Sequence, residues 1–406
     1  MSDSNQTRAG GAKSEAPDRA APSAYVATGS AYAAAGVDTQ AGDRAVELMK
    51  AAVARTLDAR VVGGVGGFAG MVDVSMLRDY RRPLLATSTD GVGTKIAIAR
   101  AMGVHDTIGQ DLVGMVVDDI AVVGARPLLM TDYIACGRVV PERIADIVRG
   151  VARACEVVGV PLLGGETAEH PGLMEAEDYD IAGAATGVVE ADGVLGAERV
   201  REGDVVLAMA SSGLHSNGYS LVRRIVADAG WALEREVAEF GRALGEELLE
   251  PTRLYSHVCL QMAERAPVHA FSHVTGGGLA ANLARVVPAG LQARIDRAAI
   301  AVPPVFSVLR ELGHLPWADV EDTLNMGVGM VVLAPPEAAD AVLAVSGESG
   351  IRTWQIGDVV ADSARSGAAA VAPSGVGDDG LPQDRIVRGT KGVDAGSVLV
   401  HGAYSA

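Results

Sequence analysis

The sequence predicts an α/β protein of two domains with mixed, α+β-type sheets. Three observations support this fold class. The 406 residues are enough for two or three domains, each with its own core. Short apolar runs alternate with amphipathic segments along most of the chain, which is the pattern of strands interleaved with helices. Several apolar runs end in glycine-rich segments, and α/β proteins bind ligands at strand ends.

In the first half of the chain, the clearest helix is expected at residues 141–158. A proline stands in its first turn and apolar residues recur at helical spacing. Residues 39–57 and 112–123 show the same periodicity. Short or alternating apolar runs predict strands at 83–88, 128–134, 160–163 and 179–189.

A turn signal at residues 202–204 opens the second half, which again mixes strands and helices. Strands are expected at 205–210, 271–274, 292–295, 328–333 and 353–359. Helices are expected between them at 221–228, 279–287, 305–312 and 337–345.

These elements predict a division into four parts. Residues 1–23 are aperiodic and rich in small and polar residues, so we expect a disordered extension. An N-terminal domain is expected at 24–197 and a C-terminal α/β domain at 198–362. Residues 363–406 are expected to be a mostly flexible tail with a possible last strand at 397–402.

Charge and composition exclude several classes of partner. The net charge is −17, with 51 acidic and 34 basic residues, and no basic run is long enough to form a stripe. Nucleic acid and anionic membranes are therefore not expected as partners. The sequence has no apolar run of 18 residues and no signal-peptide pattern, so we expect a cytoplasmic protein. The 3 cysteines fit no zinc or disulfide spacing.

Five glycine-dense segments contain the residues that bear on function. Backbone N–H groups of such segments can form a nest for an anion, and neighbouring lysines and carboxylates supply phosphate and metal contacts. Five of them in one chain predict a polyphosphate site. They lie at residues 63–68, 89–95, 164–169, 213–219 and 273–278.

Two familiar nucleotide motifs do not explain the first segment. No P-loop sequence is present, and the glycines at 64–69 lack the preceding strand and following helix that a dinucleotide fingerprint needs. Two interpretations remain. The segment is either a mobile flap that folds over phosphates or an ordinary flexible loop.

Three carboxylates are candidates for a metal site. Asp90 is a hard oxygen ligand at a strand end, suited to Mg²⁺, and Lys95 beside it is suited to phosphate unless it is simply solvated. Asp119 interrupts an apolar helix, which indicates a ligand or, alternatively, a cap or ion pair. Glu166 joins the same site if its strand neighbours that of Asp90.

His215 is the histidine with the strongest functional context. It lies between a predicted strand and helix, among Ser212, Ser216 and Asn217. An imidazole there is suited to acid–base catalysis or substrate contact, whereas a lone histidine is more often structural.

In this order, the segments closely resemble the phosphoribosylformylglycinamidine cyclo-ligase (aminoimidazole ribonucleotide synthetase) family. The resemblance implies the two-domain fold of that family. It also implies a homodimer whose N-terminal sheets pair into a barrel, and ATP near the glycine flap. The implied reaction converts formylglycinamidine ribonucleotide and ATP to aminoimidazole ribonucleotide, ADP and phosphate through an iminophosphate. Beyond the glycine segments, the resemblance is carried by residues 32–38, 105–109, 183–189, 211–220 and 325–330.

The resemblance, with the chemistry above, assigns expected roles to particular residues, with ATP as co-substrate and Mg²⁺ as metal. The expected catalytic residues are His215, Asp90 and Glu166, and the expected metal ligands are Asp90, Asp119 and Glu166. The expected ATP-binding residues are Lys50, Gly63, Gly64, Gly66, Gly67, Phe68, Gly91, Thr94 and Lys95. The expected substrate-binding residues are Ser216, Asn217, Thr275, Gly276, Gly277 and Asn325.

The chain also departs from the family pattern. Ala33 and Ala34 stand where the family commonly has Lys and Asp, and Asp118 stands where an Asn is common. The alternatives are another ATP-using enzyme of the fold, such as a formylglycinamidine synthase or a small-molecule kinase, and a non-catalytic nucleotide-binding scaffold. Selenophosphate synthetase is disfavoured because no cysteine precedes the glycine flap; the first is Cys136.

Overall fold

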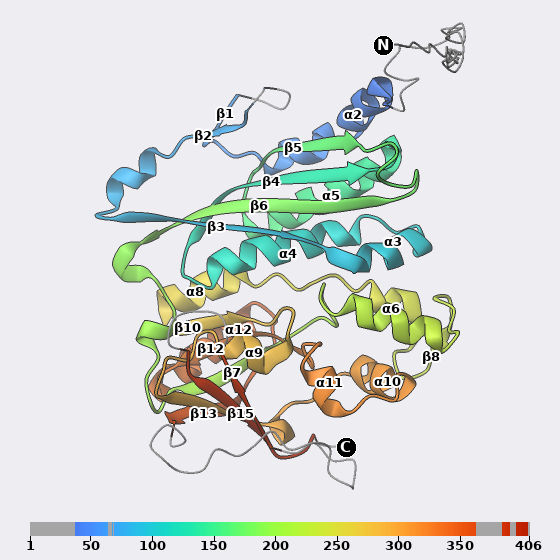
Figure 1. The fold of residues 1–406 in the computed structure, drawn as a ribbon. Helices are drawn as coiled ribbons and strands as arrows, with labels where there is room; N and C mark the ends of the chain where they lie inside the picture. Colours follow the sequence, from blue (N-terminus) through green and yellow to red (C-terminus); the bar gives the residue numbers. More distant parts are fainter. Residues whose placement is uncertain (1–36, 64–66, 68, 363–383, 390–394, 405–406) are drawn as a thin grey trace, which may run out of the picture.

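The structure, a computed structural model, describes residues 37–63, 67, 69–362, 384–389 and 395–404. These residues form two α/β units that lie one above the other in Figure 1, each built around one large sheet. The expected disordered extension at 1–23 lies outside the described residues.

The N-terminal unit contains a four-stranded sheet in the order β3-β6-β4-β5. The central pairs β3/β6 and β6/β4 are antiparallel, and β4/β5 is parallel, so the sheet is mixed as expected. Its strands are β3 (Pro83–Gly91), β4 (Arg126–Cys136), β5 (Leu162–Glu169) and β6 (Tyr179–Glu190).

Helices α2 (Thr39–Thr56), α4 (Thr107–Ala121) and α5 (Pro141–Val158) pack together beside this sheet (Figure 1). Proline begins α5, and Gly159 ends it in a left-handed conformation. The contact between α4 and α5 is close because Gly109 and Gly150 have no side chains. A Cβ on either would collide with the backbone opposite.

No helix in the described part of the chain covers the other face of the sheet (Figure 1). Leu85 in β3 is 65% exposed and Tyr133 in β4 is 42% exposed, although both are large apolar or aromatic side chains. An uncovered sheet face with such residues is unusual for a monomer.

Two strands continue beyond their predicted ends. Asp90 lies within β3, which reaches Gly91, and Gly164-Gly165 lie inside β5. The ends expected for the strands at 83–88 and 160–163 are therefore wrong. Gly165 is required in the strand because a Cβ there would collide with the carboxylate of Asp132 on β4.

The glycine flap follows a short strand. Strands β1 (Val61–Val62) and β2 (Met71–Val72) pair antiparallel on either side of it. Gly63 ends β1 with φ of 90°, and Gly67 is exposed. Gly64, Gly66 and Phe68 lie outside the described residues.

The C-terminal unit contains a seven-stranded sheet in the order β10-β12-β7-β13-β11-β15-β14. Neighbours pair antiparallel except β11 and β15, which are parallel. The strands are β7 (Val205–Ala210), β10 (Ala270–His273), β11 (Leu291–Asp296), β12 (Val328–Ala334), β13 (Thr353–Ala361), β14 (Arg385–Arg388) and β15 (Ser397–His401).

Both faces of this second sheet are covered. In β7, Val206 and Ala208 belong to one core with α9 (Gly278–Leu283), whereas Leu207 and Met209 belong to another with α8 (Ser256–Arg265) and α12 (Ala339–Glu348). Burial on both sides explains why this strand is an uninterrupted apolar run. The remaining elements are α3 (Ile96–Met102), α6 (Tyr219–Asp228), β8 (Glu236–Val237), β9 (Arg242–Ala243), α7 (Leu244–Leu248), α10 (Pro304–Leu312) and α11 (Trp317–Glu321).

The strand β15 is inserted between β11 and β14, and a buried polar cluster holds the segment around it. Arg297 is 1% exposed, and its Nε donates to Glu321 at 2.6 Å. The hydroxyl of Tyr404 donates to the same carboxylate at 2.8 Å. The tail expected to be mostly flexible thus includes two strands of the main sheet, while residues 363–383 are not described.

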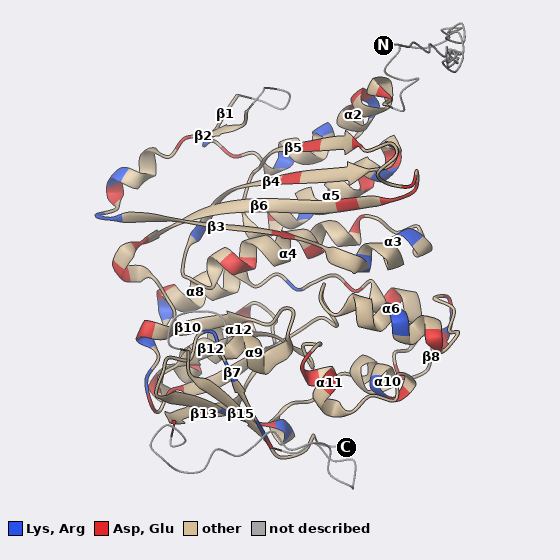
Figure 2. Ribbon diagram, in the orientation of Figure 1, with Lys and Arg blue, Asp and Glu red and all other residues tan. Residues whose placement is uncertain are grey.

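Basic and acidic side chains are interspersed over both units in the view of Figure 2, without a continuous basic band. None of the helices in the described part of the chain is long and apolar enough to cross a membrane.

Candidate active site at the domain boundary

Helix α4 presents two buried carboxylates to the C-terminal unit. Asp111 accepts hydrogen bonds from the backbone N–H of Thr252 at 2.8 Å and from its hydroxyl at 2.6 Å. Asp118 accepts from the N–H of Tyr255 at 3.0 Å and of Ser256 at 2.6 Å. Burial raises the pKa of Asp118 to about 7, although these N–H groups oppose the shift. Both carboxylates therefore hold the two units together.

Lys95 belongs to the same contact and is fully buried. Its ammonium donates to Asp111 at 2.9 Å, to the carbonyl of His215 at 3.0 Å and to the carbonyl of Glu250 at 2.7 Å. All three donors of the ammonium are used. The geometry argues against the expected role of Lys95 in binding phosphate and assigns it to domain docking.

Asp90 and Asp119 form a second, more open pair of carboxylates. Asp119 is 40% exposed and lies 2.9 Å from Nδ1 of His273, which donates to it. Burial, and then the charge of Asp119, raise the pKa of Asp90, so the two side chains are close enough to interact. Burial lowers the pKa of His273, but the Asp119 hydrogen bond and three carboxylates outweigh it and raise that pKa overall.

Glu166 does not join this pair within one chain. Strands β6 and β4 lie between β3 and β5, so Glu166 is three strand spacings, about 14 Å, from the strand of Asp90. A metal site shared by Asp90 and Glu166 was expected only if their strands were neighbours, and β3 and β5 are not neighbours in this sheet. Among the described residues, no group of three or more His, Cys, Asp or Glu could hold a metal ion. The pair Asp90 and Asp119 still fits Mg²⁺, which commonly takes one or two carboxylates together with substrate phosphates.

His215 is buried in the loop between β7 and α6, with φ of 62°. Its Nε2 accepts a hydrogen bond from the N–H of Ser212 at 3.2 Å, and its Nδ1 has no partner. Burial and then the positive charges of His273 and Lys95 lower the pKa of His215 well below its ordinary value. The ring is therefore neutral, and because Nε2 accepts, the proton is on Nδ1.

Two expected substrate residues follow His215. The hydroxyl of Ser216 donates to the carbonyl of Val92 at 2.8 Å, which links the two units. The carboxamide of Asn217 lies beside Gly276, where a Cβ would be 3.5 Å from its oxygen. The structure thus brings the segments 213–219 and 273–278 together.

The other expected substrate residues stabilise their own loops. Thr275 shares a hydrogen bond with Asn282 at 3.3 Å, and Gly277 has φ of 94°, which favours glycine. Asn325 donates to the carbonyl of Gly213 at 2.9 Å. These contacts fix the backbone of the loops that border the domain boundary.

A cavity of about 480 Å³ lies between α2, β5 and the flap residues Gly67 and Gly70. Glu166 lines it, as does Asp132, whose Oδ2 is buried without a hydrogen-bond partner. Burial raises the pKa of Asp132 to about 7. Sequence reasoning missed Asp132, because a single aspartate in a strand carries no motif.

The remaining expected nucleotide residues are dispersed. Lys50 is exposed on α2, next to Met49 of this cavity. Gly91 ends β3, and the hydroxyl of Thr94 lies 3.2 Å from that of Ser220 in the C-terminal unit.

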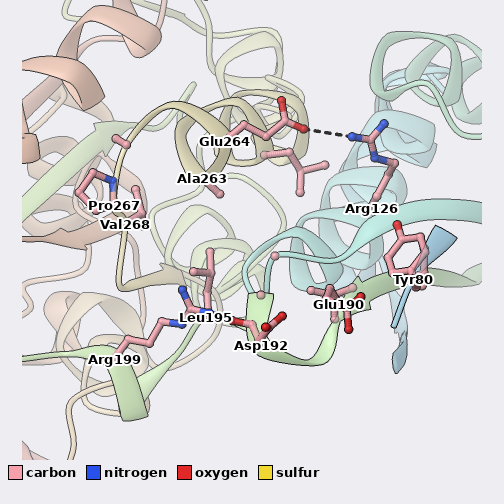
Figure 3. A pocket seen from close by; sticks show the side chains of 16 residues that line it. Tyr80, Arg126, Glu190, Asp192, Leu195, Arg199, Ala263, Glu264, Pro267 and Val268 are labelled. Atoms are coloured by element: carbon pink, nitrogen blue, oxygen red, sulfur yellow. Dashed lines mark hydrogen bonds and ion pairs between the residues drawn. The ribbon is translucent and has the colours of Figure 1, made fainter. Parts of the chain in front are cut away.

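A second cavity of about 390 Å³ lies where the connection between the units meets α8 (Figure 3). Arg126 and Glu264 form an ion pair of 3.0 Å at its rim, and Arg199 donates to the carbonyl of Asp192. It contains none of the expected site residues.

Comparison with known proteins identifies the family. Residues 69–189 match the family described as AIR synthase related protein, N-terminal domain, and residues 201–367 match its C-terminal domain. The chain is 45% identical over 335 residues to a phosphoribosylformylglycinamidine cyclo-ligase of Desulfitobacterium hafniense, covering 82% of this chain and 98% of that protein. It is 47% identical over 330 residues to a protein of the same name from Geobacillus sp. WCH70, covering 81% and 95%.

The chain belongs to the phosphoribosylformylglycinamidine cyclo-ligase family. It is thus a ligase of purine biosynthesis that forms a C–N bond.

Solved structures confirm the fold that cyclo-ligases share with other enzymes. Thiamine-monophosphate kinase from Stenotrophomonas maltophilia K279a has a TM-score of 0.60 and 20% identity, covering 77% of this chain and 93% of that chain. The hydrogenase maturation protein HypE in complex with ATP has a TM-score of 0.54 and 20% identity, covering 79% and 86%. At this identity the likeness shows the two-domain α/β fold alone, whereas the cyclo-ligases are 45% and 47% identical to this chain.

Proposed function

We propose that this cyclo-ligase converts formylglycinamidine ribonucleotide and ATP to aminoimidazole ribonucleotide, ADP and phosphate. The observation that supports it is the identity of 45% over 98% of a cyclo-ligase. Family membership supports the use of ATP as co-substrate. We infer that the reaction takes place in the cytoplasm.

The reaction needs an activated oxygen. The amide oxygen attacks the γ-phosphorus and the bond to ADP breaks, which gives an iminophosphate. The amidine nitrogen then attacks the carbon that carries the phosphorylated oxygen. The bond between this carbon and that oxygen breaks, and inorganic phosphate leaves. Loss of protons yields the aromatic ring. Catalysis therefore depends mainly on positioning and on stabilising the charge of the phosphoryl group.

We assign stabilisation of the phosphoryl charge to Mg²⁺, which Asp90 at the end of β3 and Asp119 at the end of α4 would hold. The metal would neutralise phosphoryl oxygens when bound. His273 orients Asp119 through their 2.9 Å hydrogen bond. Glu166 is assigned instead to the nucleotide, because it lines the flap cavity with Gly67.

His215 is suited to donate a hydrogen bond rather than to remove a proton. Its ring is neutral, Nε2 is occupied by an N–H donor, and the free nitrogen is Nδ1 with its proton. Such a neutral imidazole can hold the amide oxygen in line with the phosphoryl group, as electrophilic histidines do elsewhere.

We further propose a homodimer in which the uncovered sheet faces pair into a barrel. The exposed side chains of Leu85 and Tyr133 support this. A double change of these residues to glutamate is expected to yield monomers by light scattering, with Leu173→Glu, at a residue 84% exposed outside the sheet, as the matched control. An unchanged dimer in the double variant would contradict the assignment.

The activity itself is tested by incubating the chain with ATP, Mg²⁺ and formylglycinamidine ribonucleotide. We expect ADP release that depends on the ribonucleotide, with a product that gives the diazo reaction of an aromatic amine. ATP hydrolysis without such a product would refute the proposal.

A further inference from the structure

The segment from Glu250 to Ser256 joins α7 to α8 along the domain boundary, and it is held at almost every residue. Glu250 and Thr252 are bound by Lys95 and Asp111 as described. The carbonyl of Pro251 accepts from Ser212 at 2.5 Å. Tyr255 and Ser256 are bound by Asp118. The backbone here is therefore rigidly placed.

Arg253, in the middle of this segment, is the exception. Among the described residues, no hydrogen bond or ion pair joins its side chain, and its Nε is buried without a partner. The neighbouring carboxylates are already engaged. Glu250 pairs with Arg242 at 2.7 Å, and Asp111 pairs with Lys95 at 2.8 Å. Arg253 is partly exposed as a residue, and a buried Nε without a partner is costly unless something else satisfies it.

Other buried polar atoms without partners lie at the same domain boundary as Arg253. Its positive charge contributes to the low pKa of His215, as does that of His273, so the three side chains are within electrostatic reach. The described part of the chain has buried polar atoms without partners at His215 Nδ1, Arg253 Nε, Ser256 Oγ and His273 Nε2, all at this boundary. Four such atoms at one boundary indicate a place for a polar ligand.

We propose that Arg253 is the anchor for a phosphate group of one of the two phosphorylated reactants. This inference rests on the proposed function, in which the ribonucleotide carries a monophosphate and ATP a triphosphate. The planar guanidinium matches phosphate oxygens with two parallel N–H donors. The segment from Glu250 to Ser256 is already ordered, so placing the Arg253 guanidinium against a phosphate costs little conformational entropy on binding.

The test compares Arg253→Ala, Arg253→Lys and wild type in steady-state kinetics with each reactant varied in turn. Arg224→Ala is the matched control, since Arg224 is 80% exposed and paired only with Asp228 on its own helix. Truncation of a charged hydrogen-bonding group is expected to raise KM for one reactant about 10- to 100-fold. KM for the other reactant and kcat should stay within about threefold, and lysine should restore part of the loss.

The reactant whose KM rises identifies the source of the phosphate: the ribonucleotide monophosphate or the triphosphate of ATP. The thermal shift given by ribose 5-phosphate, and separately by ATP, gives a readout that a purely structural role would not change. We expect one of these shifts to vanish in Arg253→Ala but not in Arg224→Ala. Unchanged KM values with unchanged thermal shifts would overturn the proposal.

The outcomes separate this inference from the proposed function. Wild-type chain without ribonucleotide-dependent ATP turnover would refute the proposed function, and the two thermal shifts would still decide the role of Arg253. If the wild type turns over normally and Arg253→Ala changes neither the KM values nor the thermal shifts, only the proposed phosphate anchor is refuted. If Arg253→Ala fails to fold, the same measurements on Arg253→Gln decide the question.

Discussion

Two pairs of aspartates lie within a short distance along the domain boundary, and they differ in what satisfies them. Asp111 and Asp118 are fully buried, and among the described residues their side chains accept hydrogen bonds from Lys95 and from the segment 250–256. Asp90 and Asp119 are partly exposed and have few protein donors, mainly Gly91 and His273. The first pair completes the fold. The second leaves oxygen atoms available for a cation or a ligand, so burial and pairing with protein groups separate the docking carboxylates from those proposed to bind a metal.

The largest expected effect falls on the open pair. Asp90→Asn should reduce turnover on the order of 10³-fold because it removes a charge that holds Mg²⁺ against the phosphoryl group. Titration of activity with Mg²⁺ measures this, and gel filtration and the melting temperature verify that the fold is intact. Wild-type turnover in excess EDTA would refute the metal, and near-normal turnover of Asp90→Asn would refute the residue.

His215→Ala should lower kcat by at least about 10²-fold while the affinity for ATP changes little. Because its pKa lies well below 6.5, His215 should contribute no change of activity in a pH profile around 6.5. The contribution of His215 to folding stability changes with pH in the direction opposite to that of a histidine paired with a carboxylate. The unfolded chain binds the proton first, so stability falls as pH drops below about 6.5. Equal losses of ATP binding and turnover would place His215 in the nucleotide site instead.

Changes to the buried ion pair of Lys95 and Asp111 should affect the stability of the fold rather than catalysis. Lys95→Met leaves Asp111 without its counter-ion and should lower the free energy of unfolding by about 3–5 kcal/mol. The double variant Lys95→Met with Asp111→Leu should recover part of it. Denaturant titration measures both variants. If Lys95→Met retained full stability but lost ATP binding, Lys95 would be a phosphate ligand after all.

Asp118→Asn is the mildest change and tests the raised pKa of about 7. The folded carboxyl binds a proton that the unfolded one releases near pH 4, so stability should fall as pH rises from about 4 to 7. Asparagine keeps one acceptor oxygen for the N–H groups of Tyr255 and Ser256 and removes this slope. The difference between variant and wild type should grow by at most about 1.4 kcal/mol per pH unit in that window. Parallel stability curves would show that Asp118 is ionised throughout.

Much of the fold was predictable because it depends on local patterns. The helix at Pro141–Val158 and the apolar run of β7 follow from periodicity and burial. The extension of β5 through Gly164-Gly165 was not predictable. It depends on pairing with the neighbouring strand β4, which local sequence does not reveal.

The candidate site was predictable in its segments but not in its contacts. Lys95 was expected to bind phosphate, yet its partner Asp111 is on the next long helix and both are buried. Strand order separated Glu166 from Asp90. His273 is the first residue of the glycine-dense segment 273–278, but it was assigned no role, although its position in that segment could have indicated one. Arg253 carries no motif, and only its lack of a partner distinguishes it.

The inserted strand β15 has a consequence for synthesis of the chain. Its partner β11 lies about 105 residues earlier, at Ala293 opposite Val398. After β13 (Thr353–Ala361) has been made and before β15 has, β11 has only β13 on one side, and its other edge is an open template for intermolecular pairing. The nascent C-terminal unit is thus vulnerable to aggregation until β15 emerges and the Glu321 cluster closes over it, and chaperone dependence should be greatest in this interval.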